Sequence, residues 1–467
     1  MAQKTTATLL QLAAKSLLRN EPAAIQALGE LPRDIFIPLF NTAFLGGYKE
    51  TLKAMVRVWP FYCLHIGTLS IQDTCYELLE AMIDGLQLLP TQDSSSWGTK
   101  LRILDLRQDL DCETTCSDKS TYSFCFQSCI YSERSILKIE EAQHNVSCLG
   151  IADSEPVPAS GWEPLELLID ISFNDSVKAK QFLSFLRDKV EQSFGSLHLC
   201  CRNLQIDKMS DLKSNLQFLD MGCMDHLEVD EVLLNEISSL LSQMSHLESL
   251  NLSNIPFKSC KGRNFRTFLT CLGRLDSLQE LNLSCFCLTN QLHKLLRVLP
   301  PQLDTLCLSF SDLSNRDVTA LSQSSQATHL RLLNLSNNQI FWEADEPFLI
   351  LLDKVSGTLQ HLELNNCLVA DTALSVLITA LSRCSHLRVF SFAFNPITFP
   401  ALVNLLQHVV ALKELKFVIY PVPVHCYENG NFHGDVDHEK FAQVQTQLKV
   451  MLQEAKREDM SWTTYLE

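Results

Sequence analysis

Leucine residues in the second half of the chain recur with the spacing L-x-x-L-x-L. Seven such sets can be aligned, and their first residues are separated by 31, 25, 27, 29, 28 and 25 positions. A further apolar residue follows ten positions after each first leucine, so the pattern extends beyond the leucine set. The aligned sets are Leu247/Leu250/Leu252, Leu278/Leu281/Leu283, Leu303/Leu306/Leu308, Leu330/Leu333/Leu335, Leu359/Leu362/Leu364, Leu387/Phe390/Phe392 and Leu412/Leu415/Phe417.

This period is typical of leucine-rich repeats, in which each unit buries its leucines only against its neighbours. Segments 317–325 and 371–384, which lie between leucine sets, have helical spacing and predict helices outside the sheet. The sequence therefore predicts an α/β fold. We expect a leucine-rich-repeat solenoid, a horseshoe with a parallel inner sheet and outer helices, behind an N-terminal α-helical cap or adaptor module.

Polar residues recur eight positions after the first leucine of several sets. Asn338, Cys367 and Asn395 occupy this position, where leucine-rich repeats carry Asn or Cys. Side chains of these types can satisfy backbone groups in a turn. We expect these residues to bond the turn that follows each strand.

Earlier segments resemble degenerate repeats, and they define the expected domains. The expected boundaries are a helical module at 1–100, degenerate repeats at 101–246, regular repeats at 247–425 and a C-terminal cap at 426–467. Residues 108–162 break the period and are rich in Cys, Ser and Thr, so we interpret them as a partly disordered insertion. The degenerate sets are Leu101/Leu104/Leu106, Phe194/Leu197/Leu199/Leu204 and Leu216/Leu219/Met221.

If the leucines point inward, the alternate strand residues form columns on the concave face. Small hydroxyl and amide side chains dominate these columns, which run on to Glu414 and Lys416 in the last set. They can admit a protein segment at close range, or they can simply solvate the sheet, and the pattern leaves both interpretations open. The candidate substrate-binding residues are Ser249, Asn251, Ser253, Glu280, Asn282, Ser284, Thr305, Leu332, Asn334, His361 and Glu363.

The first hundred residues do not show this repeat and instead predict short helices. One helical face near the N-terminus carries Leu9, Leu12, Ala13 and Leu17. The spacing is that of an amphipathic helix and differs from the apolar core of a signal peptide. Pro32 suits a first helical turn, and Pro38 predicts a further break.

Composition and charge restrict the classes of partner. Asp and Glu number 54 against 38 Lys and Arg, a net charge of −16, which argues against direct binding to nucleic acid or to anionic lipid. No stretch reaches the roughly 18 apolar residues that a membrane span needs. We therefore expect an intracellular, cytoplasmic protein, with a nuclear share left open, whose 18 cysteines are free thiols.

We find no motif for catalysis, and we expect neither enzyme activity nor a cofactor or metal. The cluster Cys112, Cys116, Cys125 and Cys129 has a non-standard spacing for zinc, so free loop cysteines are the preferred interpretation. Two LxxLL motifs, at 292–296 and 402–406, fall on predicted repeat helices. Core packing therefore explains them better than binding to a nuclear receptor.

The helical module resembles the docking region of ubiquitin-ligase receptors. The spacing TLxxxAxxxL resembles the helix that binds elongin C, although Ala13 stands where Cys is usual. The following L-P-x-x-I-x-x-x-L resembles a cullin-2 box and lacks the second proline of the cullin-5 version. The resemblance implies an elongin-binding set of Leu9, Leu12, Ala13 and Leu17, and a cullin-binding set of Leu31, Pro32, Ile35 and Leu39.

Sequence blocks along the whole chain resemble the PRAME (preferentially expressed antigen in melanoma) family, and within it the oogenesin-like members. The blocks are 31–36, 51–56, Trp59-Pro60-Phe61, 104–107, 199–201 and Tyr420-Pro421-Val422-Pro423. The resemblance implies a receptor that joins a protein substrate to elongin B/C and cullin-2. It equally allows a ligase-independent scaffold or transcriptional corepressor acting in differentiation, proliferation and apoptosis. An F-box role through Leu31-Pro32, or a plain solenoid cap, are further alternatives for the helical module.

Overall fold

The chain forms two compact units in the computed structural model. The N-terminal unit comprises Met1–Arg202 and Phe218–Asp220, and the C-terminal unit comprises Asn203–Gln217 and Met221–Glu467. The residues that the structure describes are 9–61, 63–66, 76–87, 101–106, 165–173, 177–193, 195–207, 216, 218–231, 233–255, 262–342, 345–428 and 434–465. The expected insertion at 108–162, with its four-cysteine cluster, lies outside them.

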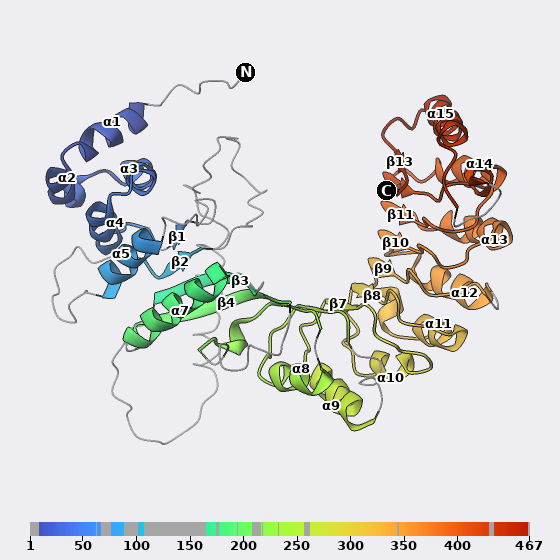
Figure 1. Ribbon diagram of the computed structural model, residues 1–467, viewed down its shortest axis with the longest axis horizontal. Helices are drawn as coiled ribbons and strands as arrows, with labels where there is room; N and C mark the ends of the chain where they lie inside the picture. The colour runs from blue at the N-terminus through green and yellow to red at the C-terminus, as the bar shows by residue number, and fades with distance from the viewer. Residues whose placement is uncertain are drawn as a thin grey trace. The chain divides into compact units, whose positions relative to one another are not determined.

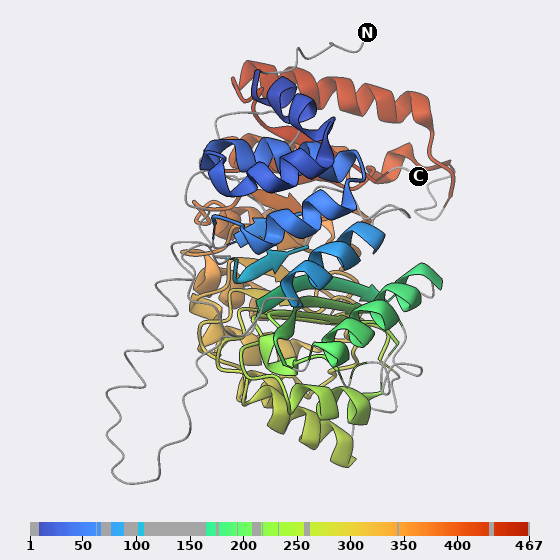
Figure 2. The same cartoon turned by 90° about the vertical axis from the view of Figure 1, so that its left-hand side faces the viewer.

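Helices dominate the beginning of the N-terminal unit, and strands with further helices between them follow (Figure 2). The elements are α1 (Leu9–Leu18), α2 (Glu21–Ala27), α3 (Arg33–Leu45), α4 (Lys49–Arg57), β1 (Cys63–His65), α5 (Tyr76–Gln87), β2 (Ile103–Asp105), β3 (Leu165–Phe173), α7 (Val177–Gln192) and β4 (Leu197–Ile206). The strand order in this unit is β1-β2-β3-β4, and the pairs β1–β2 and β2–β3 are parallel.

Two features of this unit differ from the sequence-based expectation. The sheet begins at β1, inside the segment that we expected to be helical only, and Leu64 of β1 pairs with Leu104 of β2. Helix α3 also continues through Pro38, where we expected a break. Proline removes one backbone donor, but buried residues on both sides of it, such as Ile37 and Leu39, favour continuing the helix.

The core of the helical region surrounds Trp59, which is 1% exposed. Its ring meets the rings of Phe36, Phe40 and Phe61 edge-on at centroid distances of 6.1, 5.4 and 5.7 Å. Such edge-to-face pairs add to the stabilisation that comes from burying aromatic area. The Trp-Pro-Phe block therefore anchors α3 to the first strand of the sheet.

The C-terminal unit is a solenoid in which each strand is followed by helical or turn structure (Figure 1). Its strands form the order β4-β5-β6-β7-β8-β9-β10-β11-β12-β13, and neighbouring strands from β4 onward pair in parallel. The strands are β5 (His226–Val229), β6 (Ser249–Leu252), β7 (Glu280–Leu283), β8 (Thr305–Cys307), β9 (Leu332–Asn334), β10 (His361–Glu363), β11 (Val389–Ser391), β12 (Phe417–Ile419) and β13 (Ser461–Thr463).

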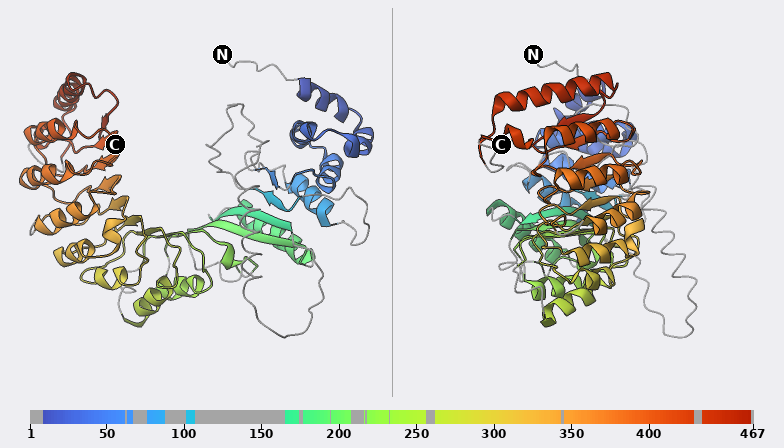
Figure 3. Two further views of the ribbon diagram at one scale, coloured as in Figure 1. Left: turned by 180° about the vertical axis from the view of Figure 1, so that it is seen from behind. Right: turned by 90° about the vertical axis from the view of Figure 1, so that its right-hand side faces the viewer.

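Helices α8–α14 lie on one side of these strands, as the view from behind shows (Figure 3). The two segments with helical spacing fall on α11 and α13, so those predictions are confirmed. The helices are α8 (Leu234–Leu241), α9 (Gly262–Leu272), α10 (Leu292–Leu296), α11 (Asn315–Ser322), α12 (Glu346–Val355), α13 (Asp371–Leu381), α14 (Phe399–Val409) and α15 (His438–Glu454).

The repeat register is confirmed from β6 to β11. The second residue of each strand is paired with its equivalents in the neighbouring strands and is at most 1% exposed; these residues are Leu250, Leu281, Leu306, Leu333, Leu362 and Phe390. The residues that flank them in each strand face outward and are at least partly accessible, except for Ser391, which is 1% exposed. The structure thus has the expected inner sheet and outer helices.

The registers expected at the two ends of the array were wrong. In the last repeat, Phe390 pairs with Val418, so the inward set is Leu415/Val418/Tyr420 and begins three residues later than expected. Phe417 is 55% exposed on the outward side, where we had placed Glu414 and Lys416. The leucine pattern gave the wrong register here because Tyr420, which is 1% exposed, takes the last inward position of the set.

The set expected at Leu216/Leu219/Met221 was also wrong. Met221 lies in a short 3-10 helix (Met221–Cys223), and the strand that follows it is β5. The inward set there is Met224/Leu227/Val229, and each of these residues is at most 1% exposed. A β-branched residue closes this set in place of a leucine, so the leucine pattern pointed to the wrong segment.

Asn338, Cys367 and Asn395 bond the turns between repeats, as expected. The amide oxygen of Asn395 accepts from the backbone N–H groups of Cys367 and Val369, both at 3.0 Å. Its amide nitrogen donates to the carbonyl of Leu364 at 2.8 Å. Ser311, which the sequence analysis overlooked, occupies the same position in an earlier repeat and donates to the carbonyl of Leu283 at 3.2 Å. Buried polar groups thus link successive repeats.

No helix in the described part of the chain is long and apolar enough to cross a membrane.

Candidate functional site

Helix α1 has apolar residues on two opposite sides. Ala14 and Leu18 are 0% and 2% exposed on the side that packs against α3. Leu9 and Leu12 are 86% and 53% exposed on the other side. Exposed apolar surface of this kind gains free energy when a partner covers it.

The structure therefore brings the expected elongin-binding residues to one helical face. Leu9, Leu12 and Ala13 are exposed, and Leu17 is half-buried at the margin of the same face. We define Leu9, Leu12, Ala13 and Leu17 as the α1 stripe. The sequence analysis found the stripe from its spacing. It did not predict that Ala14 and Leu18 pack the opposite side of the helix against the rest of the unit.

Hydrogen bonds fix the helices that carry the stripe. The Glu21 carboxylate, in the first turn of α2, accepts from the Thr51 backbone N–H at 3.1 Å and from the Thr51 hydroxyl at 2.9 Å. Thr51 is fully buried on α4, where few other polar groups could replace this partner. Asn20 accepts from the Ala23 backbone N–H at 3.4 Å at the start of α2. The junction between α1 and α2 is thereby held in place.

Three of the four expected cullin-binding residues are accessible. Pro32 is exposed at the N-cap of α3, and Leu31 and Ile35 are partly exposed beside it. Leu39 has no exposed surface and packs in the core of the unit. Leu39 therefore packs inside the unit and is not accessible for the cullin contact that the sequence predicted.

The candidate residues on strands β6 to β10 lie on the outward side of the sheet, and Ser253 and Ser284 directly follow β6 and β7. Most are partly accessible, and several bond one another. The Glu363 carboxylate accepts from the Asn334 amide at 2.8 Å, and its other oxygen lies 2.8 Å from His361 Nε2. Ser284 donates to the Asn282 side chain at 2.6 Å. These bonds hold the polar side chains in one arrangement before any partner arrives.

Cys307, Cys367 and Cys384 in the repeat array are poor nucleophiles. Burial raises the pKa of the Cys307 thiol to about 12, and the carboxylates of Glu363 and Glu280 add to the increase. Burial likewise raises the pKa of Cys367 and of Cys384 to about 12. A neutral thiol neither attacks a substrate nor readily binds a metal ion. These residues therefore serve packing and hydrogen bonding.

The two LxxLL motifs are buried, as the packing interpretation predicted. Leu292, Leu295 and Leu296 on α10 are at most 6% exposed. Leu402, Leu405 and Leu406 on α14 are at most 2% exposed. These leucines face the repeat core and are not available to a receptor groove.

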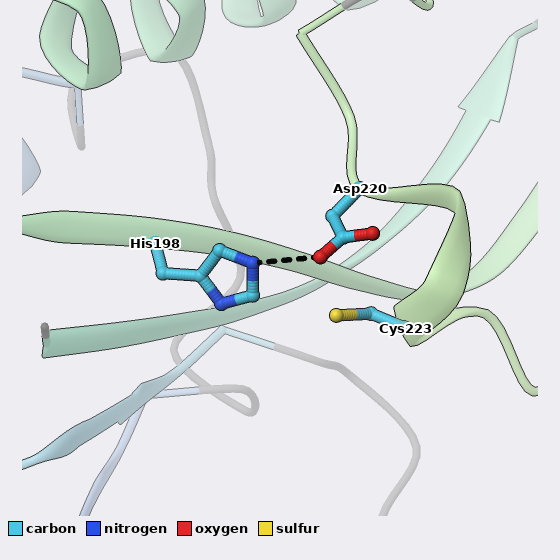
Figure 4. Close-up of side chains that lie close together, drawn as sticks. All are labelled: His198, Asp220 and Cys223. Atoms are coloured by element: carbon cyan, nitrogen blue, oxygen red, sulfur yellow. Dashed lines mark hydrogen bonds and ion pairs between the residues drawn. The ribbon is translucent and has the colours of Figure 1, made fainter. Parts of the chain in front are cut away.

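A polar pair lies on β4 and the loop that follows it in the N-terminal unit. His198 Nε2 is 3.2 Å from a carboxylate oxygen of Asp220 (Figure 4). Figure 4 also labels Cys223, which belongs to the C-terminal unit. The pair is partly exposed, and we assign it no role beyond this contact.

The repeat array behind a helical N-terminal unit defines a leucine-rich-repeat protein. Two family models cover most of the chain: the PRAME N-terminal domain matches residues 6–114 and the PRAME C-terminal domain matches residues 165–465. The chain belongs to the PRAME family.

Relatives of known sequence agree with this assignment. The human protein PRAME family member 12 is 33% identical over 98% of this chain and 92% of its own length. Leucine-rich repeat-containing protein 14 of Rattus norvegicus is 32% identical over 98% of this chain and 97% of its own length. A chain in a structure of the Rad7 and Elc1 complex in yeast covers 91% of this chain and 96% of its own length. Its TM-score is 0.32 at 11% identity, a likeness from which we conclude nothing.

Proposed function

We propose that this protein is a non-catalytic target receptor of a cullin-2/elongin B/C ubiquitin ligase. The N-terminal unit docks on the ligase, and the repeat array holds the protein that becomes ubiquitinated. The ligase chemistry belongs to the partner subunits. Holding a target close to the reaction centre supplies a high effective concentration, which by itself accelerates the transfer.

The exposure of the α1 stripe is the observation that carries this proposal. A solenoid cap needs only one apolar side, which faces the core. Helix α1 uses Ala14 and Leu18 for that purpose and still presents Leu9 at 86% exposure. The stripe has the spacing that resembles an elongin-binding helix, and the accessible Leu31, Pro32 and Ile35 follow it along the chain.

The first experiment is a pull-down of the full chain with purified elongin B/C and cullin-2. The double variant Leu9→Asp, Leu12→Asp places two charges where apolar contact is proposed. An unpaired charge in a desolvated contact costs several kcal/mol, so elongin binding should be lost. Circular dichroism should be unchanged, because both residues are exposed in the free protein.

A matched control carries Ile350→Asp and Val376→Asp, which are 47% and 44% exposed on α12 and α13. This control should bind elongin B/C like the wild type. If the wild type does not bind elongin B/C, or if the two double variants behave alike, the ligase proposal is wrong. The ligase-independent scaffold or corepressor role would then be the remaining candidate.

The cullin contact is tested by a separate variant, Pro32→Ala with Ile35→Ala. Both residues lie at the start of α3, away from the α1 stripe along the chain. We expect this variant to keep elongin B/C and to lose cullin-2 in the same pull-down. Loss of both partners would instead point to a damaged fold.

A further inference from the structure

One backbone position in the C-terminal unit is left-handed in every repeat from β5 to β11. It lies five residues after the first outward residue of each strand. Its φ values fall between 48° and 60° in Glu231, Asn254, Cys285, Phe310, Asn337, Asn366 and Phe394. We call these seven residues the rim column. They lie just past the carboxyl ends of the strands, where backbone bonds such as Phe310 N–H to the Ser336 carbonyl (3.1 Å) continue the ladder.

Asparagine suits a left-handed position, whereas a bulky residue there is strained. Three of the seven residues are Asn, as this rule predicts. Phe310 and Phe394 contradict the rule, and they are 58% and 47% exposed. The strained backbone and the exposed part of each ring bring the free protein no stabilisation, so contact with a partner is the use that accounts for them.

The residues between the two aromatics offer polar groups. The Asn366 amide donates to the Asn337 side-chain oxygen at 2.9 Å. The Asn337 amide hydrogens and the Asn366 side-chain oxygen have no partner in the described part of the chain. At the far end, the Phe394 ring stacks on Tyr465, with centroids 5.9 Å apart and planes 7° apart. The patch therefore has an aromatic group at each end and an amide pair in the middle.

Strand spacing sets the length of a matching ligand. Phe310 and Phe394 are separated by three repeat steps, which at ~4.8 Å each span roughly 14 Å. An extended peptide advances ~3.4 Å per residue, so about four residues cover this span. Side chains at positions i and i+4 of an extended peptide point to the same side.

Charge at the same edge selects the kind of peptide. The loop segments 284–291, 309–314, 336–342, 365–370 and 393–398 contain no Lys, Arg or His, and the carboxylates of Asp312 and of Asp345, at the N-cap of α12, lie among them. Trp342, 75% exposed, adds apolar surface in the third of these loops. An acidic edge with exposed aromatic rings complements a segment that is both apolar and basic.

We propose that the rim column binds an extended, basic segment of a partner protein through apolar side chains at positions i and i+4. Those two side chains contact Phe310 and Phe394, and the intervening backbone bonds Asn337 and Asn366. This inference rests on the proposed role as a target receptor and states which edge of the repeat array takes the target. It assigns the principal contact to the rim, not to the polar columns of the concave face.

The test is panning a phage library of random dodecapeptides on the full-length protein, with counter-selection on the variant Phe310→Asn, Phe394→Asn. Asparagine is the residue that three other repeats use at this position, so the variant should fold, with a melting temperature equal to the wild type or a few degrees higher. We expect enriched peptides to carry two apolar residues in an i, i+4 relation, together with Lys or Arg.

A synthetic fluorescent copy of the most enriched peptide then gives affinities by polarisation. We expect the double variant to bind at least tenfold more weakly. The control Ile350→Asn, Val376→Asn should bind like the wild type, and added salt should weaken binding. An absence of enriched peptides, enrichment of acidic peptides, or equal binding to wild type and double variant would each overturn the proposal. No elongin or cullin is present, so this outcome is independent of the pull-down.

Discussion

Replacing Asn395 by alanine should destabilise the repeat array more than any surface change in the same repeat. The Asn395 side chain is fully buried between β11 and α14. Its oxygen accepts from two backbone N–H groups, those of Cys367 and Val369, each at 3.0 Å. Its nitrogen donates to the carbonyls of Leu364 and Phe392 at 2.8 and 2.6 Å. Alanine can replace none of these bonds.

The two orphaned donors set the magnitude. A buried polar group left without a partner costs about 1–3 kcal/mol. Two such N–H groups give roughly 4 kcal/mol, before counting the carbonyls, which have other ways of finding partners. For a unit of this size, 1 kcal/mol corresponds to about 2–4 °C in melting temperature. We therefore expect a decrease of roughly 8–16 °C.

Urea denaturation followed by circular dichroism measures the free energy, and hydrogen exchange locates the damage. The amides of Cys367 and Val369 should lose protection before those of the helices. Asn404→Ala is the matched control: this half-buried residue lies on α14 of the same repeat, and alanine is a good helix former. A loss below about 1 kcal/mol for Asn395→Ala would refute the reasoning, since water would then have satisfied both donors.

Two further predictions concern titration and thiol reactivity. Hydrogen bonds and charge from Lys416 and Arg457 lower the pKa of Asp459 from 3.8 to about 2. The contribution of this carboxylate to stability is therefore present above pH 4 and is lost as the pH falls towards 2. We expect the urea midpoint of the variant Asp459→Asn to vary less with pH over that range than the midpoint of the wild type. Exposed Cys285 should react with a thiol reagent at pH 8, whereas buried Cys367, whose pKa is raised to about 12, should react only after unfolding, and mass spectrometry of labelled peptides separates the two.

The middle of the fold could be predicted because each repeat there uses the same residue type for the same task. Between β6 and β11 the inward residues are almost all leucine, and their spacing gave the correct strand, register and buried asparagine. At the ends, other residues do the same work. Tyr420 and Val229 fill inward positions as well as leucine does, because burial depends on apolar area and shape and not on residue identity. A pattern of leucines alone cannot see them.

The candidate sites show a similar division. Helical spacing was enough to place Leu9, Leu12 and Ala13 on one face of α1. It could not show that Leu39 is buried, because burial of a helix depends on what packs around it. The sequence analysis missed the rim column, although part of its signal is in the sequence. Asn254, Asn337 and Asn366 occur at the same offset after the start of their strands. Only the φ angles reveal that Phe310 and Phe394 occupy an asparagine position.

The buried side chains of Asn338 and Asn395 each bond the repeat that precedes them along the chain. Asn395 satisfies Val369, which lies 26 residues before it, and Asn338 does the same for Leu313 in the preceding repeat, at 3.1 Å. These two turns are therefore completed by a side chain that is synthesised later. On the ribosome, a repeat that has just emerged still lacks this partner, and it reaches full stability only when the next repeat follows. Truncation from the C-terminus should accordingly weaken the last repeat that remains, whereas removal of an upstream repeat leaves the polar clamp of the following one in place.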